Sequence, residues 1–142
     1  DEVFKPTCRT DQLEDCSQEE IINSYDNALL YTDYFLDKII NFLRKYDAER
    51  EAAMIYFSDH GESLGENGIY LHGLPYMIAP EAQKHIGALM WFGEQARQQI
   101  DLGLLQKKEA KEYSHDNLFH TLLGFFEVKT DLYDKKLDIL SD

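Results

Sequence analysis

The sequence predicts an α/β fold in which helices flank a mainly parallel sheet. Three observations predict it: helical periodicity over residues 21–46 and two short, continuous apolar runs at residues 52–57 and 85–92. Short apolar runs without alternation are typical of strands that are covered on both faces, as in parallel sheets. A long amphipathic helix followed by such a strand is the pattern of an α/β domain.

The first element is expected to be a long helix that begins after Ser17. Ser17 and Glu20 have the spacing of a capping box, in which each side chain satisfies a backbone N–H group of the other residue. From Ile21 to about Tyr46, apolar residues recur at nearly helical period, with charged residues toward the other side. This helix should lie against the sheet, and the residues before Ser17 should form a loop.

Two strands, a long loop and a final helix are expected to follow. The strands are predicted over Ala52–Phe57 and His85–Phe92, with a glycine-rich loop over residues 58–80 between them. Residues 93–111 are polar and have room for one helix. An amphipathic helix is predicted over Ser114–Phe126, and residues 130–142 should form a loop that packs back on the domain.

Size and charge restrict the possible functions. With 142 residues, of which 44% are hydrophobic, the chain can form one domain or part of one. A net charge of −13, without a cluster of lysines and arginines, argues against binding to nucleic acid. No apolar run approaches the ~20 residues that cross a bilayer. An acidic domain that handles phosphate needs a bound cation or local donors, so the charge favours a metal ion.

Cys8 and Cys16 enclose a short loop near the start of the chain. Such loops are often closed by a disulfide in exported proteins, so we predict a Cys8–Cys16 disulfide and a location in the periplasm or outside the cell. The alternative is two free thiols in a cytosolic protein. A zinc site is disfavoured because no second cysteine pair or neighbouring histidine accompanies the two residues.

The candidate site lies in the loop after the first predicted strand. Asp59 and His60 follow that strand at its carboxyl end, where ligands bind in open α/β sheets. A carboxylate and an imidazole are suitable zinc ligands, but zinc needs about four donors, so these two residues make an incomplete site. The alternative is a purely structural pair with a hydrogen-bonded imidazole.

His72 follows in the same loop, twelve residues after His60. It is expected either to donate to a phosphate group or to bind a second metal. The remaining histidines are interpreted as structural: His85 at the start of a strand, His115 at the start of a helix and His120 on that helix.

The run from Ser58 to Gly73 resembles, nearly residue for residue, the distal metal segment of the phosphoethanolamine transferases that modify lipid A, which include the mobile colistin-resistance enzymes. These enzymes belong to the alkaline phosphatase/sulfatase superfamily. The similarity covers essentially the whole chain. It extends to four further places: Phe4–Cys8 with Cys16, Tyr25–Asp33, Pro75–Pro80 and Ser114–Gly124.

The resemblance implies that residues 1–142 are the C-terminal portion of a periplasmic, sulfatase-like catalytic domain. Its parent would be anchored by N-terminal spans at the periplasmic face of the bacterial inner membrane. Zn²⁺ would be held by Asp59, His60, an upstream acidic residue and a nucleophilic Thr, with His72 on the substrate phosphate or a second metal. The Thr would take phosphoethanolamine from phosphatidylethanolamine and pass it to lipid A.

The upstream acidic residue, the nucleophilic Thr and the membrane spans of that family are not in this sequence. The resemblance therefore implies that this polypeptide alone is inactive, has no catalytic nucleophile of its own, and associates with its missing half or with further copies. Two alternatives stay open. One is another enzyme of the superfamily, a sulfatase or a phosphoglycerol transferase, since Ser58–Glu62 is a motif shared across it; the other is a non-catalytic metal-binding domain.

Overall fold

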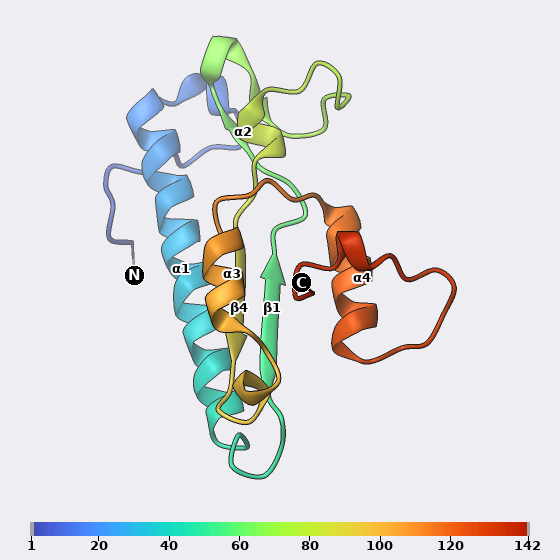
Figure 1. The fold of residues 1–142 in the computed structure, drawn as a ribbon. Helices are drawn as coiled ribbons and strands as arrows, with labels where there is room; N and C mark the ends of the chain where they lie inside the picture. Colours follow the sequence, from blue (N-terminus) through green and yellow to red (C-terminus); the bar gives the residue numbers. More distant parts are fainter. Residues whose placement is uncertain (1, 142) are drawn as a thin grey trace.

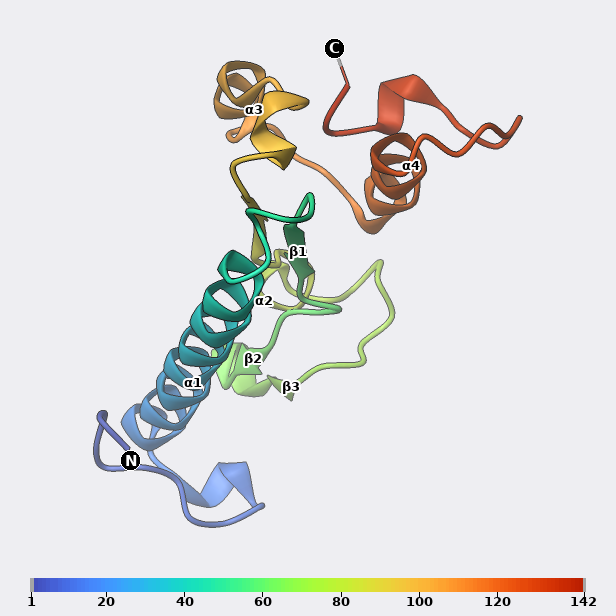
Figure 2. The same ribbon diagram turned by 90° about the horizontal axis from the view of Figure 1, so that it is seen from below.

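The computed structural model describes residues 2–141. Its helices and strands are, in chain order, α1 (Gln18–Arg44), β1 (Ala53–Phe57), β2 (Ser63–Leu64), β3 (Tyr70–Leu71), α2 (Glu81–Lys84), β4 (Ala88–Phe92), α3 (Leu102–Lys108) and α4 (His115–Phe125). Strands β1 and β4 form a small central sheet, with α1 on one side and α3 and α4 on the other (Figures 1 and 2). The layered α/β arrangement is the predicted one.

The capping box of α1 is present. The Ser17 hydroxyl accepts from the Glu20 N–H at 3.3 Å, and the Glu20 carboxylate accepts from the Ser17 N–H at 2.8 Å. Hydrogen bonds from the backbone and the hydroxyl of Ser17 lower the pKa of Glu20. The helix ends at Arg44, two residues before the predicted end, because the chain turns there toward β1.

The prediction of a mainly parallel sheet is wrong for the described residues. Strands β1 and β4 pair antiparallel, with Ala53 opposite Phe92 and Phe57 opposite Ala88, and β2 and β3 also pair antiparallel. A continuous apolar run indicates how a strand is covered and carries no information on the direction of its neighbour. The connection from Ser58 to Gly87 starts at the carboxyl end of β1 and comes back to that same end, so β4 runs in the opposite direction to β1.

The predicted start of the second strand and its burial also need correction. His85 follows the last residue of α2, and the strand begins three residues later, at Ala88. Met54 and Phe92 are buried in the sheet, whereas Ala88 and Leu89 are exposed. The described part of the chain therefore covers only part of the sheet.

Helix α1 also leaves apolar side chains uncovered. Its exposed large apolar residues are Ile22, Leu29, Leu30, Tyr31, Tyr34, Phe35 and Phe42. A soluble domain rarely exposes so many large apolar groups on one helix without a partner surface. No helix within residues 2–141 is both long and apolar enough to cross a bilayer.

Cys8 and Cys16 form a disulfide, as predicted. The loop that it closes is fastened to α1, because the Cys8 N–H donates to the Glu20 carbonyl at 3.2 Å and to the Ser24 hydroxyl at 3.0 Å. The N-terminal loop is therefore part of the fold around the first turns of α1.

Helix α4 begins as predicted and holds the C-terminal residues. The Ser114 hydroxyl accepts from the Asp116 N–H, and the Asn117 side chain accepts from the Ser114 N–H at 2.9 Å. The fully buried Thr121 accepts from the Ile139 N–H at 3.0 Å, so the tail packs back on the domain. The rings of Phe92 and Phe125, 6.4 Å apart, join α4 to the sheet.

Removing this cap should weaken the fold measurably. Ser114→Ala is expected to lower the free energy of unfolding by about 1 kcal/mol, because backbone N–H groups in the first turn of α4 lose their acceptor. Urea denaturation of the chain measures it. Ser114→Asp is the matched control, since aspartate also caps helices and should keep most of the stability. An equal loss in both variants would contradict the capping role.

Candidate metal centre

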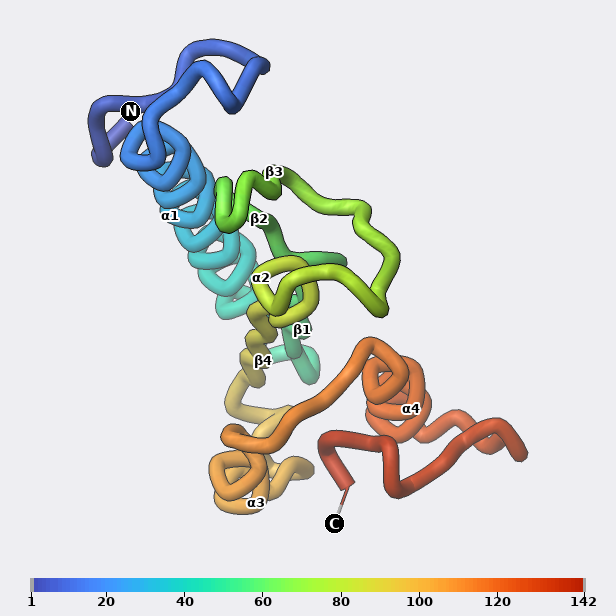
Figure 3. The backbone as a smooth tube through the Cα atoms, turned by 90° about the horizontal axis from the view of Figure 1, so that it is seen from above, coloured from blue at the N-terminus to red at the C-terminus, as the bar shows by residue number. Residues whose placement is uncertain are grey.

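The candidate site is built on the long connection between β1 and β4. Strands β2 and β3 lie side by side (Figure 3) and pair with Ser63 opposite Leu71. This pairing brings His72 back beside His60. The turn between them needs Gly65, whose φ is 113°, a conformation that L side chains rarely adopt. The Gln18 side chain donates to the Leu64 carbonyl at 2.7 Å and fastens this hairpin to the start of α1.

Helix α2 holds the segment between His60 and Ser63 in place. The Gly61 N–H donates to the Gln83 carbonyl at 3.0 Å, and the Gln83 side chain donates to the buried Ser63 hydroxyl at 2.9 Å. A Cβ atom on Gly61 would overlap the Ala82 carbonyl oxygen and lie 3.0 Å from its carbon. Only glycine lets the site segment approach α2 this closely.

His60 has one ring nitrogen committed to the backbone and one free. Its Nδ1 lies 2.9 Å from the Gly61 carbonyl oxygen, which can only accept, so Nδ1 carries a proton and Nε2 is the ring nitrogen left for a ligand. That Nε2 lies 3.8 Å from Oδ2 of Asp59. A backbone carbonyl that fixes the tautomer in this way is the usual support of a metal-binding histidine.

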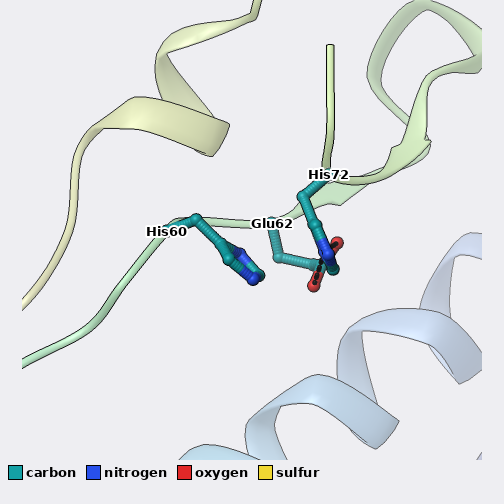
Figure 4. Close-up of side chains that lie close together, drawn as sticks. All are labelled: His60, Glu62 and His72. Atoms are coloured by element: carbon teal, nitrogen blue, oxygen red, sulfur yellow. Dashed lines mark hydrogen bonds and ion pairs between the residues drawn. The ribbon is translucent and has the colours of Figure 1, made fainter.

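His72 has a comparable arrangement with a carboxylate. Its Nδ1 lies 3.2 Å and 3.3 Å from the two carboxylate oxygens of Glu62, which leaves Nε2 open. The rings of His60 and His72 stack with centroids 3.7 Å apart, and Figure 4 shows Glu62 beside His72. One ligand atom from each of His60, Glu62 and His72 lies within 4.8 Å of the others.

The structure brings two of the three predicted site residues, His60 and His72, into one cluster, and adds Glu62 to them. Asp59 is outside that cluster but touches His60: its side chain is 90% exposed, and its Oδ1 accepts from the His60 N–H at 3.1 Å. Glu62 was not predicted. A usable signal was in the sequence, because residues 60 and 62 of an extended segment point to the same side.

The donor set fits a zinc ion in part. Two atoms bound to one tetrahedral zinc at about 2.0–2.2 Å lie roughly 3.4 Å apart, close to the 3.8 Å between Asp59 Oδ2 and His60 Nε2. Asp59 and His60 would supply two of about four ligands. Their chemistry, one carboxylate and one neutral imidazole with a fixed tautomer, is that of protein zinc sites.

The other histidines lie outside this cluster. His120 accepts from the Asp134 N–H at 3.0 Å and is structural, as predicted. His115, interpreted only as part of a helix start, reaches across from α4 so that its Nε2 lies 2.9 Å from the Ser58 carbonyl oxygen. It thereby fixes the first residue of the site loop. His85 is exposed, at the end of α2.

Comparison with known proteins identifies the family. The sulfatase family model matches residues 1–128. The phosphoethanolamine transferase EptA of Salmonella typhimurium is 51% identical over 96% of this chain, which spans 26% of that relative. The chain therefore has about a quarter of the length of the curated relatives that it matches.

Two solved structures have the same fold. The C-terminal periplasmic domain of phosphoethanolamine transferase EptC from Campylobacter jejuni is 48% identical with a TM-score of 0.90; the match covers 99% of this chain and 44% of that one. The integral membrane protein lipooligosaccharide phosphoethanolamine transferase A from Neisseria meningitidis is 47% identical with a TM-score of 0.93, over 98% of this chain and 26% of that one. This chain belongs to the sulfatase family and, within it, is similar to the phosphoethanolamine transferases.

Proposed function

We propose that this chain supplies one side of the active site of an enzyme that transfers phosphoethanolamine from phosphatidylethanolamine to lipid A. The names of its relatives support the reaction class. The main observation in favour of a metal site is the arrangement of His60: the Gly61 carbonyl occupies its Nδ1, and its Nε2 lies 3.8 Å from the Asp59 carboxylate. The parent protein would act at the periplasmic face of the inner membrane, consistent with the Cys8–Cys16 disulfide.

Asp59 and His60 are proposed as two ligands of Zn²⁺. When bound, zinc lowers the pKa of a coordinated hydroxyl group and offsets charge on phosphoryl oxygens. The protein's part is to hold the two donors at a fixed separation, and the bonds from Gly61, Gln83 and His115 to this segment do so. The remaining donors, an acidic residue and a nucleophilic Thr, are proposed to belong to the parent outside these residues.

The five threonines of this chain support an external nucleophile, because each hydroxyl is occupied away from the cluster. Thr7 and Thr32 donate to Glu2 and the Ala28 carbonyl, and Thr121 donates to the Asn117 carbonyl. The hydroxyls of Thr10 and Thr130 accept from backbone N–H groups two residues later. We therefore propose that this polypeptide alone does not catalyse the transfer.

His72 is proposed to act on the phosphate side of the site. Its open Nε2 stands beside His60, where it can donate to a phosphoryl oxygen when protonated or bind a second metal when neutral. Glu62 fixes which nitrogen is open. The exposed apolar side chains of α1 are proposed to pack against the rest of the parent's catalytic domain, since they need a cover.

The parent enzyme tests this function. Purified parent should transfer phosphoethanolamine from phosphatidylethanolamine to lipid A, lose that activity with its zinc on treatment with a chelator, and regain it when zinc is added. Residues 1–142 alone should show no transfer. Full transfer by a zinc-free parent would refute the metal role, and hydrolysis of sulfate esters without transfer would favour a sulfatase.

Glu62 offers a narrower test of how the site is ordered. Glu62→Gln in the parent is expected to lower transfer by about 10- to 100-fold, because the amide holds the His72 ring less firmly than a carboxylate does. Zinc content, measured by metal analysis, should stay unchanged. Glu66→Gln is the matched control, since Glu66 lies in the same loop and its carboxylate accepts only from the Leu64 N–H. Loss of zinc in Glu62→Gln would make Glu62 a ligand instead.

A further inference from the structure

The segment between β3 and α2 presents large apolar side chains to solvent next to the candidate site. Residues 74–78, the apolar loop, follow His72 directly after Gly73. Their exposed fractions are 79% for Tyr76, 94% for Met77 and 67% for Ile78. Figure 3 shows the chain between β3 and α2 extending away from the other elements.

The apolar loop is a defined turn. The N–H groups of Ile78 and Ala79 both donate to the Pro75 carbonyl, at 2.9 and 3.0 Å, and Ala79 is buried. Tyr76 to Ile78 are thus held at the tip of a turn whose far end is packed into the protein. Their outward position is set by the backbone.

The apolar loop differs from the other exposed apolar residues in that it lies within a long stretch of the sequence without a charged residue. In a chain with 29% charged residues and a net charge of −13, residues 67–80 contain no Asp, Glu, Lys or Arg, and no other stretch is free of charge for so long. At the base of the loop, the Lys84 ammonium pairs with the Glu81 carboxylate at 2.7 Å and lies 5.2 Å from the centre of the Tyr76 ring. Apolar side chains with a tyrosine and a lysine at their rim are typical of protein segments at the membrane–water interface.

We propose that the apolar loop inserts into the interfacial region of a lipid bilayer and so holds the site at the membrane surface. The proposal rests on the proposed function in one respect: the donor there is a membrane lipid, so the site must reach its headgroup. A polyanionic protein is repelled by anionic lipid, and contact is least unfavourable where no acidic side chain comes between. The uncharged stretch that follows the site meets that condition, and the similar Neisseria transferase is an integral membrane protein.

A fluorescent label at the tip tests the proposal without any enzymatic readout. The only cysteines are joined in the disulfide, so Met77→Cys can be labelled alone with an environment-sensitive dye. With vesicles of phosphatidylethanolamine and phosphatidylcholine, the emission should shift to the blue and stay shifted at high salt. Leu132→Cys, 70% exposed in the tail beyond α4, is the matched control and should not respond. No shift at residue 77, or equal shifts at both positions, overturns the proposal.

Vesicle partitioning of the same chain gives a second measurement. Changing Tyr76, Met77 and Ile78 together to Ser should lower the partition coefficient by at least about tenfold, because the buried apolar area is lost. Leu132→Ser should leave it unchanged. In the parent protein, a dye at residue 77 that is blue-shifted and shielded from a water-soluble quencher in the absence of both lipid and detergent would mean that protein covers the loop, and the proposal would be wrong. These measurements detect membrane binding and not transfer, so the proposal of membrane insertion can be right or wrong independently of the proposed activity.

Discussion

Replacing His60 by alanine in the parent enzyme is expected to lower phosphoethanolamine transfer by at least about a thousandfold, because several kcal/mol of metal-derived stabilisation of the reacting phosphate are lost. The same protein should lose its zinc, measured by metal analysis after gel filtration. Asp59→Ala should behave likewise. Asp59 and His60 are adjacent, and their donor atoms lie 3.8 Å apart, so each would fill a different position around the zinc ion. The loss of one ligand is therefore not compensated by the other.

Two comparisons make the result specific. His85→Ala removes an exposed histidine that lies at the end of α2 and should leave zinc content and transfer unchanged. His72→Ala should reduce transfer severely while zinc stays bound, if His72 acts on the phosphate. A His60→Ala enzyme that kept both its zinc and its activity would remove the basis of the metal assignment.

The helices α1 and α4, and the place of Asp59 and His60 after β1, could be predicted from the sequence because their determinants are local. The pairs Ser17–Glu20 and Ser114–Asn117 are spaced for hydrogen bonds within one helical turn, and both capping boxes are present. Asp59 and His60 follow an apolar strand directly, so their place at the end of β1 needed no knowledge of distant residues. His72 came beside His60 through a turn marked by glycines.

Strand direction and the small elements could not be predicted in the same way. The antiparallel pairing of β1 with β4 depends on how a thirty-residue connection returns, which apolar runs do not encode. Helix α2 has four residues, too few for a periodic signal, and the two-residue strands β2 and β3 are shorter still. Glu62 was missed because its role depends on the ring of His72, ten residues away.

A single methyl group on Gly61 is expected to destabilise the fold at the site segment. Gly61→Ala should lower the free energy of unfolding by about 1–3 kcal/mol, the usual cost of overpacking, because the new Cβ overlaps the Ala82 carbonyl. Neither side can move easily: the Gly61 N–H is bonded to the Gln83 carbonyl, and the Gln83 side chain to the buried Ser63. Urea denaturation of the chain measures the change.

Gly87→Ala is the matched control, because nothing lies within 4 Å of a Cβ atom at that position, although the Gly87 carbonyl also binds the site segment through the Ser58 N–H. Equal stability of the two variants would show that α2 is not fixed against the site. If Gly61→Ala stays folded in the parent but loses zinc, the clash has been relieved by displacing His60 from Asp59. That outcome would make the contact with α2, and not the ligands alone, a determinant of the metal geometry.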